Sequence, residues 1–219
     1  MISIKVGRSA MRRWIVLLVV VSSATLVGSQ GTANAGPAYD GAAAARWALG
    51  HAQDQQPDIA GCTWFASQAL WAGGMPKDET WNDKTISGLM VHGVAGSRAA
   101  TLADELYRYL LFHTQTLPIP LAGPHAQSGQ DRFATNAVPE ARLGDLIAYD
   151  WDGDDVIDHM SVVTHIGKNN YPDVSEWGTA KDGRRSDYVY RGWTWSENDK
   201  NWLRVKNPHV IATLLVVAP

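Results

Sequence analysis

The sequence has one cysteine, Cys62, among its 219 residues. A disulfide bond within the chain is therefore excluded. Three roles remain for the thiol: a buried inert side chain, a link to another chain, or a reactive group. Composition alone leaves the inert and the reactive roles equally open, so the rest of the chain must decide between them.

Long apolar runs are also scarce. The longest, from Trp14 to Val21, is short for a membrane span, which needs about 18–20 residues. Four basic residues precede this run, and no acidic residue occurs before Ala35. Ala33-Asn34-Ala35 has the small-x-small pattern of a cleavage site. We therefore predict a secretory signal peptide over 1–35, with an uncleaved anchor as the alternative, and a single domain over 36–219.

Positive charge is limited. Lys and Arg number 19 against 22 Asp and Glu, and loss of residues 1–35 would change the formal net charge from −3 to −7. An acidic surface argues against nucleic acid and against electrostatic adhesion to anionic membranes or wall polymers. We expect a secreted monomer with no nucleic-acid partner and no stable membrane association after signal cleavage.

The motifs of two common hydrolase classes are missing. The chain has neither G-x-S-x-G nor H-E-x-x-H, which disfavours serine and zinc hydrolysis. Cys62 instead stands at the first turn of a predicted helix that follows Gly61 and ends at Gly73-Gly74. Free backbone N–H groups and the helix dipole at that position favour an ionised thiol.

The pattern of elements predicts an α+β fold with an antiparallel sheet, because helices come first and short strands follow. Polar segments around Trp81 and from Leu117 to Pro139 are expected to be loops, the first packing one aromatic ring. The predicted helices are 42–52, the Cys62 helix and 98–113, and the predicted strands are 146–149, 159–166, 173–177, 188–190 and 210–217.

A cysteine nucleophile needs a base within hydrogen-bond reach and a third group that orients the base. Among the seven histidines, His159 begins a predicted strand directly after an acidic turn. Glu176 lies on the next predicted strand, in an apolar setting where a carboxylate needs a partner. We predict a Cys62–His159–Glu176 site, with Ser175 or a backbone carbonyl as the alternative orienting group.

The acidic turn itself resembles a calcium loop. Asp150, Asp152, Asp154 and Asp158 fall at positions 1, 3, 5 and 9 of that pattern. Asp155, however, replaces the glycine of position 6, and Ser161 replaces the bidentate glutamate of position 12. An acidic turn without a metal is therefore the favoured interpretation, and a calcium site is the alternative.

Several pieces of the sequence resemble known families. The CHAP family of cysteine, histidine-dependent amidohydrolases and peptidases is similar at Gly61–Phe65, Leu143–Ile147, Asp158–Val163 and Val174–Glu176. The putative amidase domain family of secreted bacterial proteins is similar at Tyr39-Asp40 and across Asp150–His159 as well. The resemblance implies a papain-like fold of the NlpC/CHAP type, with Cys62 as nucleophile, His159 as base and then acid, and Glu176 orienting it.

The resulting hypothesis is a secreted cysteine amidase or peptidase that needs no cofactor and acts on a peptide or peptidoglycan-like substrate. An acyltransferase that uses the same Cys–His pair is the enzymatic alternative. An extracellular binding module with an inert thiol is the alternative without catalysis. The sequence does not identify the bond that is cleaved.

Overall fold

The computed structural model describes residues 38–54, 61–85, 96–123, 135–178, 188–195 and 202–219. The predicted signal peptide lies outside these residues. The helices are α1 (Gly41–His51), α2 (Gly61–Ala72), α4 (Arg98–Thr101), α5 (Ala103–His113) and α6 (Trp202–Lys206), with a short 3-10 turn at Lys168–Asn170. The strands are β1 (Leu117–Ala122), β2 (Leu146–Asp150), β3 (His159–Ile166), β4 (Pro172–Glu176), β5 (Tyr188–Gly192) and β6 (Ile211–Val216).

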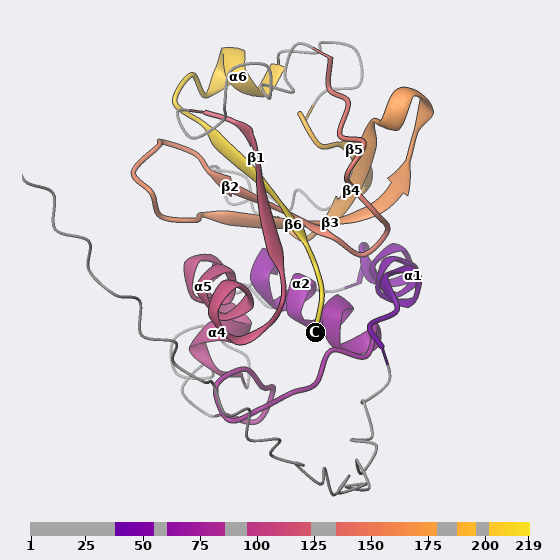
Figure 1. Cartoon of the computed structure of the whole chain (residues 1–219), viewed down its shortest axis with the longest axis vertical. Coiled ribbons are helices and arrows are strands. Elements are labelled where there is room, and N and C mark those ends of the chain that lie inside the picture. Colours follow the sequence, from indigo (N-terminus) through magenta and orange to yellow (C-terminus); the bar gives the residue numbers. More distant parts are fainter. Residues whose placement is uncertain (1–37, 55–60, 86–95, 124–134, 179–187, 196–201) are drawn as a thin grey trace, which may run out of the picture. The chain divides into compact units, whose positions relative to one another are not determined.

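The strands form one antiparallel sheet in the order β1-β6-β2-β3-β4-β5. Figure 1 shows α1, α2, α4 and α5 grouped on one side of this sheet and α6 on the other. The predicted α+β class with an antiparallel sheet is therefore confirmed. None of the helices in the described ranges has the length and apolar character needed to cross a membrane.

Each face of the sheet has its own core. Alternate residues of β3 show why, because Met160 and Val162 pack with the helices while Val163 packs with the opposite cluster around Tyr149 and Trp193. Strand β2 is buried along its whole length, as expected for a strand covered on both faces. On the helical side, the predicted packing of Trp81 is confirmed, since its ring is fully buried and its Nε1–H donates to Ser67 Oγ at 3.0 Å.

The start of α1 is fixed against the turn before β2. Asp40 caps the helix by accepting the N–H of Ala43 at 3.0 Å. The Tyr39 hydroxyl donates to the carbonyl of Gly144 at 2.7 Å. Gly144 has φ +83°, and a Cβ there would lie 2.5 Å from the backbone of Gly41, so only glycine fits this crossing.

Asp145 extends the same anchor to the neighbouring strand β6. Its carboxylate is 3 % exposed and accepts the N–H of Arg142 at 2.8 Å and of Val217 at 3.0 Å. Burial raises the pKa of Asp145 to about 6, although the two N–H donors oppose the shift. The Gly144-Asp145 pair therefore joins α1, the turn and the end of β6, which is a structural role.

We expect Gly144→Ala to destabilise the fold by more than about 3 kcal/mol, because it combines positive φ with a backbone collision. Gly74→Ala is the matched control: Gly74 also has positive φ, +94°, but a Cβ there meets nothing within 4 Å. Its cost should be only about 1–2 kcal/mol. Urea unfolding of both variants measures the difference, and equal free energies of unfolding would contradict the proposed crossing.

Two predictions of local structure were wrong. The segment Leu117–Ala122 is strand β1 at the edge of the sheet rather than a loop. Pro118 and Pro120 lack N–H donors, and an edge strand tolerates that loss because one side of it needs no donors for pairing. The predicted helix 98–113 is divided at Leu102, which is extended (φ −117°, ψ 130°). Thr101 Oγ1 bonds back to the carbonyl of Ser97 at 3.0 Å, a contact that distorts helices.

Candidate active site

Cys62 is the second residue of α2 and is partly exposed. The polar groups near its sulfur are the His159 ring, the Met160 N–H and Thr63 Oγ1, the last at 3.7 Å. Burial alone would raise the pKa of the thiol. The positive charge of His159, together with these polar groups, outweighs burial and lowers the pKa of Cys62 below its ordinary value.

His159 is the first residue of β3, as predicted, and its side chain is almost fully buried. Its Nε2 lies 2.9 Å from Glu176 Oε2, which leaves Nδ1 as the ring nitrogen for the thiol. Burial opposes a charged imidazole, but the thiolate of Cys62 and the carboxylate of Glu176 prevail and raise the pKa of His159 to about 10. The pKa shifts of Cys62 and His159 have opposite directions, as expected for two groups that stabilise each other's charged forms.

Glu176 ends β4 and is 1 % exposed. Its Oε2 accepts from His159 and from the Ser161 hydroxyl, and its Oε1 accepts from Arg191 Nη1 at 3.0 Å. Burial would raise the pKa of this carboxyl group. His159, followed by Arg191 and Ser161, reverses that effect and lowers the pKa of Glu176, so the carboxylate stays ionised.

The structure thus brings the three predicted residues together in the predicted order. The alternative orienting group, Ser175, bonds elsewhere: its hydroxyl lies 2.8 Å from Thr164 Oγ1 and donates to the carbonyl of Val189. Sequence reasoning missed Ser161 and Arg191. Ser161 could have been found, because the alternation of a strand places it on the same face as His159.

Three aromatic side chains line the outer side of the His159 ring. The ring centroids of Tyr149, Trp151 and Trp195 lie 5.9, 5.8 and 5.6 Å from that of His159. Trp195 also contacts Trp151 edge-on at 4.5 Å and carries the Arg191 guanidinium 4.3 Å above its ring. The aromatic residues therefore restrict both the imidazole and the arginine that holds Glu176.

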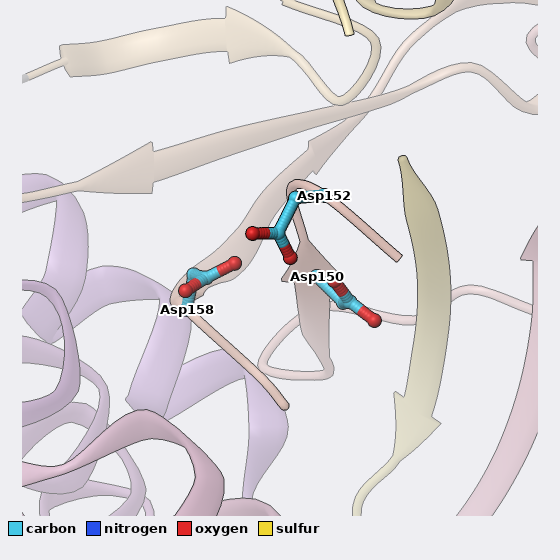
Figure 2. Close-up of side chains that lie close together, drawn as sticks. All are labelled: Asp150, Asp152 and Asp158. Atoms are coloured by element: carbon cyan, nitrogen blue, oxygen red, sulfur yellow. The ribbon is translucent and has the colours of Figure 1, made fainter. Parts of the chain in front are cut away.

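The acidic turn brings together three of its four predicted calcium ligands. Figure 2 shows the carboxylates of Asp150, Asp152 and Asp158 gathered where β2 ends and β3 is about to begin, with oxygens within 4.8 Å of one another. Asp154 is outside this group, and its Oδ1 accepts the N–H of Val156 at 2.9 Å. The metal candidate from the sequence is therefore reduced to three carboxylates.

Asp150 has another use for its oxygens. Oδ1 accepts the N–H of Gly153 at 2.7 Å and of Asp154 at 3.3 Å, and Oδ2 accepts the N–H of Asp155 at 2.9 Å. The Asp158 carboxylate accepts the N–H of Trp151 at 2.8 Å. These bonds give the turn its shape with protein groups alone, and they place Trp151 beside His159.

The comparisons with known proteins give one match. A search of curated proteins and a search of solved structures found none. The model of the putative amidase domain family matches residues 38–205, which include Cys62, His159 and Glu176. That match supports a hydrolase of amide bonds in general. The chain belongs to the putative amidase domain family.

Proposed function

We propose that the protein is a cysteine-dependent amide hydrolase whose reacting groups are Cys62 and His159. One observation carries the proposal: the continuous set of contacts from the thiol through the imidazole to Glu176. A base oriented by a third group is what a cysteine nucleophile requires. Opposite pKa shifts of Cys62 and His159 support a preformed ion pair.

The first half of the reaction forms a thioester. The Cys62 thiolate adds to the amide carbonyl. The developing oxyanion accepts a hydrogen bond from the backbone N–H of Cys62 at the start of α2. As the C–N bond breaks, protonated His159 gives its proton to the leaving amine. The products are the free amine, the acyl thioester on Cys62 and a neutral imidazole.

Water completes the cycle. Neutral His159 takes a proton from a water molecule that attacks the thioester, and the carboxylic acid leaves as the thiolate is restored. Glu176 stays ionised throughout. It accepts the Nε2–H of His159 and so fixes the orientation of the imidazole. Ser161 and Arg191 occupy the remaining sites of that carboxylate, so they act as positioning residues.

The remaining parts of the proposal concern fold type, metal and location. A nucleophile at a helix start facing a histidine at a strand start supports a papain-like, NlpC/CHAP-type arrangement. No step of this mechanism uses a metal. The backbone N–H groups that donate to Asp150 support an acidic turn without a metal. The basic and apolar pattern of residues 1–35 supports secretion. After loss of these residues, the domain would act as a monomer that binds neither nucleic acid nor membranes.

The proposed substrates are peptide amide bonds of peptidoglycan. A secreted amide hydrolase would meet such bonds outside the cell. Acyl transfer is the second candidate, because an amine that replaces water at the thioester step gives a new amide from the same intermediate. Product analysis with added amines separates the two, and a binding module with an inert thiol would form neither product.

Alkylation of Cys62 with iodoacetamide tests the ion pair. Since the pKa of Cys62 is lowered, we expect rapid labelling to persist at pH 6, well below the ordinary thiol pKa of about 8.5. His159→Ala should restore the pH dependence of a free cysteine. Labelling of the wild type only above about pH 8.5 would contradict the pair and favour the inert binding module.

A further inference from the structure

A pocket of about 330 Å³ lies along α2, outside the Cys62–His159–Glu176 site. We call it the tryptophan pocket. Its volume falls in the range of small-molecule sites, about 300–1,000 Å³. Three tryptophans that are only partly buried line it together with three polar side chains: Trp47, Trp64, Trp71, Gln68, Lys77 and Asp83.

The tryptophans are held in place by the protein. Trp47 stacks on His51 at 4.3 Å with an interplanar angle of 9°. Trp71 packs against fully buried Trp81 at 5.0 Å, and Trp64 meets Trp71 edge-on at 5.7 Å. Rings fixed before a ligand arrives lose little entropy on binding, so this pocket is preorganised. Leaving three indoles partly in water is also costly unless something covers them.

The polar groups of the pocket exclude one class of ligand. Lys77 lies 4.4 Å above the Trp71 ring and forms an ion pair with Asp83 Oδ2. The position that a cationic ligand would take over this indole is therefore occupied by the protein's own ammonium group. A quaternary ammonium or basic peptide side chain does not fit this arrangement.

The polar side chains that line the pocket favour a neutral ligand that donates and accepts hydrogen bonds. Gln68 offers both a donor and an acceptor, and the charges of Lys77 and Asp83 already balance each other. A hydroxyl group can accept from the Gln68 amide or the ammonium and donate to the carboxylate, and it brings no charge.

We infer that the tryptophan pocket binds a saccharide chain. A pyranose ring has an apolar C–H face for an indole such as Trp64 and hydroxyls at its rim for Gln68, Lys77 and Asp83. At 100° per residue, Trp64, Gln68 and Trp71 share the face of α2 that points away from Cys62. The pocket would therefore hold the glycan on the outer face of the helix, apart from the amide bond at the thiol.

This inference deepens the proposed function, and in its choice of ligand rests on it, because peptidoglycan joins a glycan to a peptide. The test uses the full chain with Cys62→Ala, which leaves the substrate uncut. Calorimetric titration with an N-acetylglucosamine tetrasaccharide and pelleting with purified peptidoglycan sacculi measure binding. Cellotetraose, which lacks the acetamido groups, shows whether the pocket takes any pyranose chain or only the amino sugar.

We expect the Cys62→Ala chain to bind the tetrasaccharide and the sacculi, and added Trp64→Ala to weaken binding at least tenfold. Asp83→Asn, a conservative change that keeps the shape of the pocket, should weaken binding severalfold even if Trp64→Ala folds poorly. Phe112→Ala is the control, because Phe112 is 79 % exposed on α5 and is not a pocket residue; its affinity should be unchanged.

Absence of binding to every saccharide would overturn the inference, and so would binding that Trp64→Ala and Asp83→Asn leave intact. Failure of the proposed function gives a different result. In that case wild type and Cys62→Ala would release equal amounts of product from sacculi, whatever the titrations show. The two conclusions are thus tested by separate measurements, heat of binding and release of new amino groups.

Discussion

Cys62→Ala is expected to reduce the rate of amide hydrolysis by at least about 10⁴-fold, because it removes the nucleophile and with it the thioester intermediate. Zymography on cell walls, with wild type and variant side by side, gives the first measurement. The rate at which amino groups are released from sacculi then gives the size of the reduction. The alanine side chain is smaller than the thiol and sits at a partly exposed helix start, so the fold should remain intact.

Cys62→Ser provides the matched variant. Serine keeps the size of the side chain and its hydrogen bonds, but its hydroxyl is not ionised by a neighbouring histidine as a thiol is. We expect activity close to that of the alanine variant. Cell-wall clearing by Cys62→Ala equal to that of wild type would refute the assignment of Cys62 as nucleophile.

Glu176→Gln is expected to lower kcat by about 10⁴-fold, since replacing the orienting carboxylate of a catalytic histidine by an amide has an effect of this order. The amide cannot stabilise the imidazolium by charge. It also leaves Arg191, whose side chain is 13 % exposed, without its carboxylate partner. The loss should therefore appear in kcat even where the variant binds substrate normally.

The pH profile distinguishes this effect from simple damage to the fold. In wild type the acidic limb reports loss of the Cys62 thiolate, and the alkaline limb reports loss of the His159 proton, whose pKa is raised to about 10. Without the carboxylate, the pKa of His159 falls, because the imidazolium loses a negative neighbour. The alkaline limb of the Glu176→Gln profile should therefore move to lower pH.

Asp173→Asn is the control for Glu176→Gln. Asp173 is also on β4 and also pairs with a histidine on β3, His165, at 2.8 Å, but that pair is largely exposed. An exposed pair contributes little, so activity and pH profile should match those of wild type. A Glu176→Gln enzyme with a normal profile would remove Glu176 from the proposed mechanism.

Much of the fold could be predicted because the sequence pattern and the packing agree. The Cys62 helix and strand 159–166 coincide with α2 and β3, since each has apolar residues at the period of its own element. The edge strand β1 was hidden by Pro118 and Pro120, which read as loop residues until their place at the sheet edge is known. The division of the helix at Leu102 accompanies bonds from the Thr101 hydroxyl back to the carbonyls of Ser97 and Arg98, which no periodicity reveals.

The reacting residues of the site could be predicted from side-chain chemistry and from the alternation of side chains along strands. Cys62 was the sole thiol, and His159 and Glu176 were singled out by their positions on strands. Arg191 was beyond such reasoning, because its approach to Glu176 depends on the register between β4 and β5, which is irregular between Val174 and Glu176. The tryptophan pocket joins α1, α2 and the following loop, and only the tertiary structure brings these together.

The position of β6 constrains how the protein folds. This strand comes last in sequence yet pairs with both β1 and β2, and β1 has no other partner in the sheet. Until residue 216 has been synthesised, β1 cannot join the sheet, and one edge of β2 stays open. Assembly must therefore wait for nearly the whole domain and proceeds through contacts distant in sequence, which makes folding slow.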